Sequence, residues 1–238
     1  KVFRKNGKDY DRLSDHIGLI PLVVVNPSDG VLIMGGSEER RRFMDSVISQ
    51  YDRHYLDHLI AYNRVLSQRN ALLKQFSKGN GEMATMEVLD LQLAQHGMVI
   101  YEKRKEFIGK IKPLFHDFYS ILAGETEEVA IEYDSVLQVK SFAQALDDSR
   151  RKDMALEYTT TGIHRDDLDF KINGYSLKKS GSQGQQKSFL ISLKLAEYRL
   201  LDVTTGRKPL LLLDDIHDKL DADRVYRLME LVCGPDFG

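Results

Sequence analysis

Residues 180–188 combine glycine, serine, glutamine and lysine in a pattern suited to binding phosphate. The segment, called here the Gly/Gln turn, reads Ser-Gly-Ser-Gln-Gly-Gln-Gln-Lys-Ser and precedes an apolar run with helical spacing. A helix N-terminus offers backbone N–H groups and the positive end of the helix dipole, which both attract an anion. Between Asp169 and Glu197 the chain carries five lysines and no acidic residue. An ordinary serine-capped helix after a loop is the alternative, and this segment alone does not separate the two.

Two carboxylates stand about thirty residues further along, directly after four consecutive leucines. Leu210–Leu213, bounded by Pro209 and by Asp214-Asp215, predict a central parallel strand that is buried on both faces. Open α/β sheets bind their ligands at the carboxyl ends of such strands. In nucleotide hydrolysis the first carboxylate of such a pair holds Mg²⁺, and the second polarises the attacking water. Acidic strand ends also cap following helices, so the pair alone is only moderately specific.

The strands and helices around these motifs follow from turn signals and apolar periodicity. Asn6-Gly7 and Asn173-Gly174 each predict a tight β-hairpin. A short, fully buried strand is expected over residues 19–25. The remaining pattern predicts strands over 129–133 and 168–172, and helices over 141–156 and 183–201. A last helix is expected to end at about residue 232.

A long helical hairpin is expected in the middle of the chain. Apolar residues at helical spacing run from an N-cap at Ser37 to Phe76, and again from Met83 towards Leu122. The Gly-Asn-Gly break at residues 79–81 predicts that these two helices are antiparallel. Pro113 is expected to kink or divide the second helix.

The overall composition excludes several classes of protein. The 238 residues carry 34 Lys and Arg and 36 Asp and Glu, a net charge of −2, so contact with nucleic acid requires a local patch. The single cysteine, Cys233, excludes an intrachain disulfide framework and a cysteine-rich metal site, and fits a cytoplasmic protein. No apolar run reaches membrane-spanning length, so no membrane partner is expected.

Two further polar clusters each allow two interpretations. Arg40–Arg42, at the start of a predicted helix, either contact phosphates or interdomain carboxylates or form a solvated face. His164 stands close to Asp166 and Asp167, which is a weak metal-binding or acid–base constellation. A structural turn is the favoured interpretation of this second cluster.

The order of the motifs resembles the signature motif, Walker B strand and D-loop of ABC-type ATPases, because Leu220-Asp221 follows the Asp pair. Fuller segments resemble one family, RecF, the SMC-like ATPases of bacterial recombinational repair. The segments that carry this resemblance are residues 35–45, 62–74, 162–167, 182–188 and 213–215.

The resemblance implies an α/β fold, part of an ABC-type ATPase head with an inserted helical domain that contains a long antiparallel helical hairpin. Residues 1–36 would belong to the ATPase lobe, and residues 37–157 to the mainly helical inserted domain. Residues 158–238 would return to the ATPase lobe with the signature motif, Walker B strand and D-loop.

The resemblance also implies an ATP-dependent DNA-binding protein of recombinational repair, replication restart and the SOS response. Its partners would be single- and double-stranded DNA together with RecO and RecR, with which it would help load recombinase at gapped DNA. ATP and Mg²⁺ would be the cofactors, and ATP would drive a head-to-head homodimer in which each signature motif closes on the partner's ATP.

Residue roles carry over by position. Three residues would contact the γ-phosphate held by the opposite subunit, namely Ser182, Gly184 and Gln185. Asp214 would coordinate Mg²⁺, and Asp215 would act on the attacking water. Asp221 would lie in the D-loop across the dimer.

The sequence departs from the ATPase pattern at several places. No G-x-x-x-x-G-K-[ST] motif is present, and in the family this Walker A loop would lie before residue 1. Asn26-Pro27 stands where a Q-loop glutamine is usual, Ile163 replaces a usual proline, and the strand bearing the switch residue would begin past Gly238. We therefore expect an ATPase as the whole protein, and a fragment that alone neither binds nor hydrolyses ATP appreciably. The alternatives are a non-enzymatic SMC-like module that docks a partner protein, or another ABC-type DNA ATPase.

Overall fold

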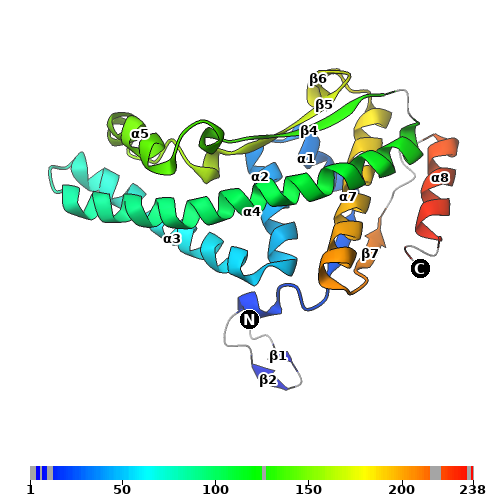
Figure 1. The fold of residues 1–238 in the computed structure, drawn as a ribbon, viewed down its shortest axis with the longest axis horizontal. Helices are drawn as coiled ribbons and strands as arrows, with labels where there is room; N and C mark the ends of the chain where they lie inside the picture. The colour runs from blue at the N-terminus through cyan, green and yellow to red at the C-terminus, as the bar shows by residue number, and fades with distance from the viewer. Residues whose placement is uncertain are drawn as a thin grey trace. The chain divides into compact units, whose positions relative to one another are not determined.

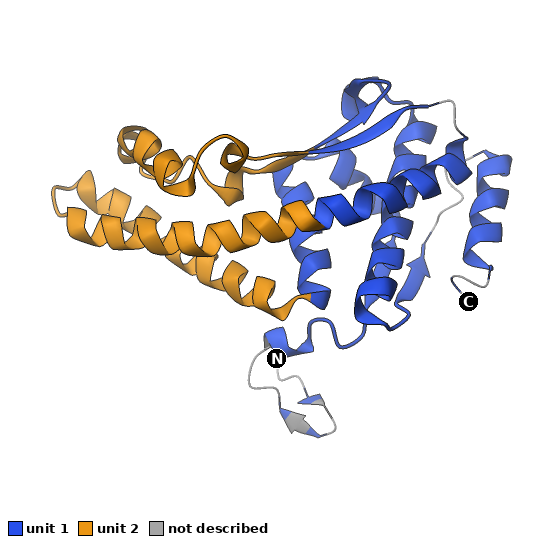
Figure 2. Ribbon diagram, viewed as in Figure 1, with its two compact units in different colours: residues 1–51, 107–132, 169–238 blue, residues 52–106, 133–168 orange. Residues whose placement is uncertain are grey.

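The computed structural model describes residues 4–5, 7–9, 13–124, 127–214, 221–234 and 237. Contacts divide the chain into two compact units, which Figure 2 shows in different colours. Unit 1 comprises residues 1–51, 107–132 and 169–238, and unit 2 comprises residues 52–106 and 133–168. The assignment of residues 37–157 to an inserted domain stays a prediction.

Unit 1 contains a parallel pair of strands, β3 (Leu22–Val25) and β7 (Leu210–Leu213). Their register pairs Leu22 with Leu210 and Val25 with Leu213. The prediction that β7 is buried on both faces is wrong for the described residues, because Leu210 and Leu212 are 58% and 52% exposed. Within the described part of the chain β7 pairs only with β3, so its other edge has no neighbouring strand there. Strand β3 likewise buries alternate residues rather than all of them.

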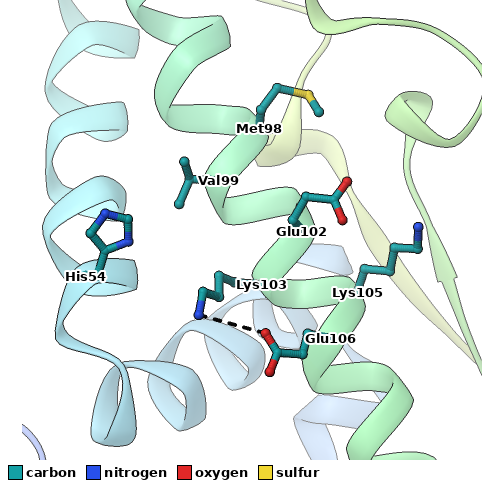
Figure 3. Close-up of a pocket in the computed structure, with 7 residues that line it drawn as sticks. All are labelled: His54, Met98, Val99, Glu102, Lys103, Lys105 and Glu106. Atoms are coloured by element: carbon teal, nitrogen blue, oxygen red, sulfur yellow. Dashed lines mark ion pairs between the residues drawn. The ribbon is translucent and has the colours of Figure 1, made fainter.

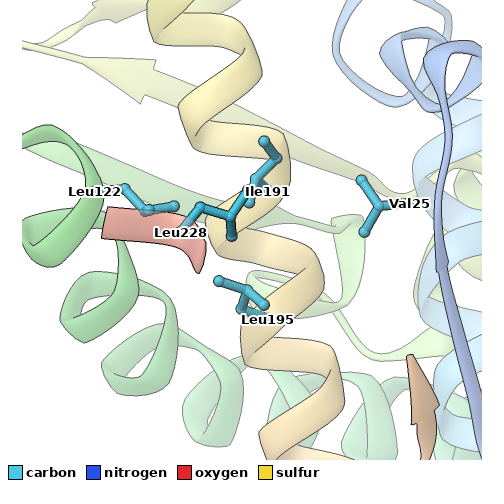
Figure 4. Packing of buried hydrophobic residues seen from close by; sticks show 5 residues of the cluster. All are labelled: Val25, Leu122, Ile191, Leu195 and Leu228. Atoms are coloured by element: carbon cyan, nitrogen blue, oxygen red, sulfur yellow. The ribbon is translucent and has the colours of Figure 1, made fainter. Parts of the chain in front are cut away.

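Helix α7 (Gln183–Thr205) forms the core of unit 1. Its buried residues include Phe189, Leu193, Ala196 and Leu200, which recur at helical spacing. Ile191 and Leu195 of this helix join a cluster that also contains Val25, Leu122 and Leu228 (Figure 4). Since Leu228 lies on α8 (Ala222–Val232), this cluster packs the last helix against α7 and β3.

The predicted helix over residues 37–76 is two helices, α2 (Ser37–Tyr51) and α3 (Arg53–Phe76). Asp52 interrupts it in an extended conformation (φ −123°, ψ 98°), and its side chain accepts a hydrogen bond from the Tyr55 N–H at 2.9 Å. Asp52 is therefore the N-cap of a new helix, a role that aspartate fills well.

Helix α4 (Met83–Ala123) is a single helix of 41 residues that continues through Pro113, green in Figure 1. The proline therefore does not divide the helix. The apolar residues of α4 that recur at helical spacing between Met86 and Ile111 are buried. The apolar face of α3 is less complete, because Ile60 is 51% exposed. No helix in the described ranges is both long and apolar enough to span a bilayer.

Both Asn-Gly hairpins are confirmed, as β1 (Arg4–Lys5) with β2 (Lys8–Asp9) and β5 (Asp167–Ile172) with β6 (Tyr175–Ser176). A three-stranded sheet has the order β4 (Val129–Asp134), β5 and β6. The remaining helices are α1 (Val31–Met34), α5 (Phe142–Leu156) and α6 (Leu177–Ser180), with short 3₁₀ helices η1 (Leu13–His16), η2 (Pro27–Gly30), η3 (Val136–Gln138) and η4 (Ile163–Arg165).

Candidate functional site

The Gly/Gln turn leads into the N-terminus of α7, as predicted, but its own side chains occupy two of the backbone donors. Ser182 is the N-cap, and its Oγ accepts from the Gln185 N–H at 3.2 Å. The Gln185 Oε1 accepts in return from the Ser182 N–H at 2.8 Å. Helix geometry leaves the N–H groups of Gln183 and Gly184 without a backbone partner inside α7. An incoming phosphate would therefore compete with this capping box rather than enter an open cradle.

Glu127 extends the contacts of the Gly/Gln turn. Its Oε1 accepts from Gln185 Nε2 at 2.8 Å, and its Oε2 accepts from the Tyr119 hydroxyl. Burial raises the pKa of the Tyr119 phenol, and the Glu127 carboxylate raises it further, so the phenol stays a donor. Glu127 was not predicted, because no local pattern links it to a residue 58 positions away.

The lysines near the Gly/Gln turn supply less free positive charge than their number indicates. Three of them have partners within unit 1: Lys171 with Glu132 (2.6 Å), Lys178 with the Gly35 carbonyl (3.3 Å) and Lys194 with Glu197 (3.0 Å). Lys171 and Lys194 therefore face carboxyl groups, and the N-terminus of α7 adds its own positive potential at the Gly/Gln turn.

Asp214 follows β7 directly and is exposed. Its N–H donates to the Val25 carbonyl at 2.8 Å, which places it beside the end of β3. There the Asp29 Oδ2 accepts from the Asn26 N–H at 2.9 Å. One exposed carboxylate fits the way proteins bind Mg²⁺, with one or two carboxylates completed by waters and substrate phosphates. Asp215 lies outside the described residues.

Asp221 is the N-cap of α8 and connects to α7 through an arginine. Its Oδ1 accepts from the Arg224 N–H at 2.9 Å, and its Oδ2 lies 3.3 Å from Arg224 Nε. Arg224 Nη1 donates to the Ser188 Oγ at 3.0 Å. Arg224 was not predicted, although its position three residues after a capping aspartate is a usable signal.

Two arginines near the start of α2 form hydrogen bonds or ion pairs with other residues of unit 1. Arg40 Nη1 donates to the Gly35 carbonyl at 3.2 Å, just past the end of α1. Arg42 pairs with Glu38 at 3.1 Å and with Glu39 at 3.0 Å. These contacts favour a structural role over phosphate binding for Arg40 and Arg42.

The turn at His164 is a structural centre of unit 2. The His164 Nδ1 lies 2.8 Å from the Tyr62 hydroxyl, and Nε2 lies 3.1 Å from the Thr159 carbonyl. The buried Arg104 pairs with Asp166 at 3.2 Å, and burial raises the pKa of that carboxyl. The geometry supports the structural interpretation, since both ring nitrogens of His164 face protein groups.

Arg69 forms a second buried network in unit 2. Its Nε lies 2.6 Å from Asp90 Oδ1 and its Nη1 lies 2.7 Å from Asp153 Oδ2. The neighbouring Asn70 Oδ1 accepts from the Thr159 N–H at 2.8 Å. The segment 62–74, which carried part of the family resemblance, therefore holds α3, α4 and α5 together.

A surface pocket of about 690 Å³ also lies in unit 2 (Figure 3). His54 and a row of α4 residues line it, including Met98, Glu102 and Lys103. Across the described ranges, no group of three or more His, Cys, Asp or Glu side chains is arranged to hold a metal ion.

Comparison with known proteins relates the whole chain to one family. The DNA replication and repair protein RecF of Flavobacterium johnsoniae is 50% identical over 239 residues, covering 100% of this chain and 67% of that protein. The RecF protein of Parabacteroides distasonis is 48% identical over 238 residues, covering 100% of this chain and 64% of that protein. The chain thus spans about two thirds of the length of these relatives. A comparison with protein-family models finds no match.

Two solved structures share the fold. The recombination mediator protein RecF-ATP in the RecFOR pathway matches with a TM-score of 0.90 and 31% identity, over 98% of this chain and 65% of that one. The RecF-ATPrS structure from the same pathway matches with a TM-score of 0.87 and 32% identity, over 97% and 64%. These matches confirm the expected fold class, part of an ABC-type ATPase head with an inserted helical domain. Together with the identity to the curated relatives, they show that the chain belongs to the RecF family of DNA replication and repair proteins.

Proposed function

We propose that the chain is the signature-bearing part of an ATP-dependent DNA-binding protein of recombinational repair and replication restart. The observation that carries this proposal is the Gly/Gln turn at the start of α7, within a chain that matches RecF proteins over its whole length. The solved RecF structures support a nucleotide-dependent role, because they are described with ATP and ATPrS.

The Gly/Gln turn acts on ATP held by a second subunit. Ser182, Gly184 and Gln185 contact the γ-phosphate after the Ser182–Gln185 capping box opens, which frees both backbone donors. Asp214 holds Mg²⁺, which neutralises charge on the phosphates, and Asp215 positions the attacking water. Asp221 contributes its carboxylate at the dimer interface.

The whole protein works in the cytoplasm as an ATP-driven homodimer on single- and double-stranded DNA. It acts with RecO and RecR to help load recombinase at gapped DNA. The 238 residues alone bind ATP poorly, because they contain no G-x-x-x-x-G-K-[ST] loop to cradle the β- and γ-phosphates.

The test uses the full-length protein and measures dimerisation by light scattering alongside ATP hydrolysis. Asp215→Asn is expected to keep ATP-driven dimerisation and to lower hydrolysis by about 10²-fold or more. Ser182→Arg, which places two substituted turns in a homodimer, is expected to weaken dimerisation and to abolish hydrolysis while nucleotide binding remains. Unchanged hydrolysis in Asp215→Asn would contradict the role of Asp215. An unsubstituted full-length protein that neither hydrolyses ATP nor dimerises with it would favour a partner-docking module instead. Tight binding of Mg-ATP to the 238-residue chain in calorimetry would contradict the assignment of the phosphate cradle to another part of the protein.

A further inference from the structure

Three histidines of unit 2 form a chain of ring-to-ring contacts that the nucleotide chemistry does not use. His54 and His58 lie one turn apart at the start of α3, and His96 lies on α4. The Nε2 atoms of His54 and His58 are 3.2 Å apart, and the Nδ1 atoms of His58 and His96 are 3.0 Å apart. Both nitrogens of the His58 ring are therefore engaged by another imidazole.

We propose that His54 and His58 bind one divalent transition-metal ion of the Zn²⁺, Ni²⁺ or Cu²⁺ class, and that His96 orients His58. Metal–nitrogen distances of about 2.0–2.1 Å in tetrahedral coordination place two ligating nitrogens about 3.3 Å apart. The observed Nε2–Nε2 separation of 3.2 Å meets this distance requirement. The i, i+4 spacing holds both side chains on the same helix face.

His96 has a defined part in this arrangement. A metal ligand on His58 Nε2 requires the ring proton to lie on Nδ1, and His96 Nδ1 is placed to accept it at 3.0 Å. Without metal, the neutral rings are linked by N–H···N hydrogen bonds, and the proton of His58 can lie on either nitrogen. A metal-bound histidine that donates its second N–H to a fixed acceptor is the usual arrangement in metal sites.

The charges around His58 are compatible with a bound cation. The carboxylates of Asp57 and Asp52 favour positive charge at the His58 ring. Lys103 at 2.7 Å from Asp52, and Arg53 at 3.6 Å from Asp57, offset part of this attraction.

The site is open on one side. His54 is exposed and its ring lines the pocket of about 690 Å³ in Figure 3. Since no third His, Cys, Asp or Glu of the described residues completes the set, water or a small exchangeable ligand fills the remaining coordination positions. Two imidazoles suit Zn²⁺, Ni²⁺ and Cu²⁺, whereas Mg²⁺ prefers oxygen ligands.

Calorimetric titration of the metal-free 238-residue chain, without a polyhistidine tag, tests the proposal with ZnCl₂ and NiCl₂ near pH 7.5. One saturable ion per chain is expected, and His54→Ala and His58→Ala should each weaken binding by at least about tenfold. His96→Phe, which removes the acceptor for the Nδ1 proton of His58, should lower the metal affinity about 10- to 100-fold. His116→Ala is the matched control, because His116 is exposed on the same helix as His96 and lies outside the cluster. MgCl₂ should show no binding that depends on His54.

A second readout separates metal binding from folding. Long-range ¹H–¹⁵N spectra should show Zn²⁺ shifting the Nε2 signals of His54 and His58 and fixing His58 as its Nδ1–H tautomer. Equal affinity in His54→Ala and in the unsubstituted chain, or the absence of saturable binding, would overturn the site. If His58→Ala lacks the native circular dichroism spectrum, the exposed His54→Ala variant decides the question.

Discussion

Arg224 Nη1 donates a hydrogen bond to Ser188 Oγ over 3.0 Å, and this bond ties the start of α8 to the helix that follows the Gly/Gln turn. The same guanidinium lies 3.3 Å from Asp221, so one side chain touches both the candidate D-loop and the candidate signature helix. The leucine-rich cluster around Leu228 packs the same two helices together. The two motifs are therefore positioned as one body within unit 1.

Replacing Arg224 with Met should lower the free energy of unfolding by about 1–3 kcal/mol, because the buried Ser188 hydroxyl and Asp221 lose a charged donor. A double-mutant cycle with Ser188→Ala, measured by urea denaturation, should give a coupling energy of about 0.5 kcal/mol or more. Strict additivity of the two substitutions would show that the contact contributes nothing.

Arg69→Met should destabilise the protein by about 3–5 kcal/mol, since it leaves the fully buried Asp153 carboxylate without its cation. Arg42→Met is the matched control, because Arg42 pairs with Glu38 and Glu39 at the surface. This substitution should lower the free energy of unfolding by about 1 kcal/mol or less. Denaturant midpoints measure both changes. Similar losses for the two variants would contradict the assignment of Arg69 as the centre of a buried network.

Glu197 should make stability fall as the pH rises. Burial raises the pKa of Glu197, while Lys194 lowers it in part, so the folded protein holds a proton that the unfolded chain releases near its ordinary value of 4.5. Between the unfolded and the folded pKa the folded state binds more protons, and its stability therefore declines with increasing pH. Glu197→Gln should be more stable than the unsubstituted chain at pH 8 and equal to it below pH 4.5. If the difference in unfolding free energy between the two proteins stays constant from pH 4.5 to pH 8, Glu197 does not have this effect.

Gly162→Ala should destabilise unit 2 by about 1–3 kcal/mol or more. Gly162 has φ 118°, and an added Cβ would lie 2.8 Å from the Tyr62 hydroxyl and 2.9 Å from Phe142 Cζ. Gly109→Ala is a contrasting control, because nothing lies within 4 Å of its added Cβ inside α4. That substitution should stabilise by roughly 0.5–1 kcal/mol. Thermal unfolding of both variants checks the pair, and a stable Gly162→Ala protein would be inconsistent with the geometry.

Local signals in the sequence predicted most elements because their causes are local. Strands β1 and β2 pair as the Asn6-Gly7 signal predicted, Asn173-Gly174 forms the expected turn, and Ser141 and Ser182 begin α5 and α7 as N-caps. The break at Asp52 escaped prediction, since the apolar periodicity of α2 and α3 continues across it. The cap is visible only once the extended backbone of Asp52 is known.

Non-local contacts could not be predicted in the same way. Glu127 meets Gln185 across 58 positions, and Arg69 meets Asp153 across 84. Four consecutive leucines indicated a doubly buried strand, but burial depends on what covers each face, and Leu210 and Leu212 are exposed among the described residues. The occupation of the Gly/Gln turn by its own capping box depends on rotamers that a motif does not specify.

If the Gly/Gln turn of one subunit acts on ATP held by another, two inactive full-length variants should restore hydrolysis when they are mixed. Ser182→Arg removes the turn's contact, whereas Asp215→Asn removes the residue that acts on water. In a mixed dimer, one site combines the intact Asp215 of the first variant with the intact Ser182 of the second. We predict that ATP hydrolysis, nearly absent in each variant alone, recovers in the mixture to a measurable fraction of the unsubstituted rate. A mixture as inactive as its components, with mixed dimers demonstrated by mass spectrometry, would show that the turn does not act across the dimer.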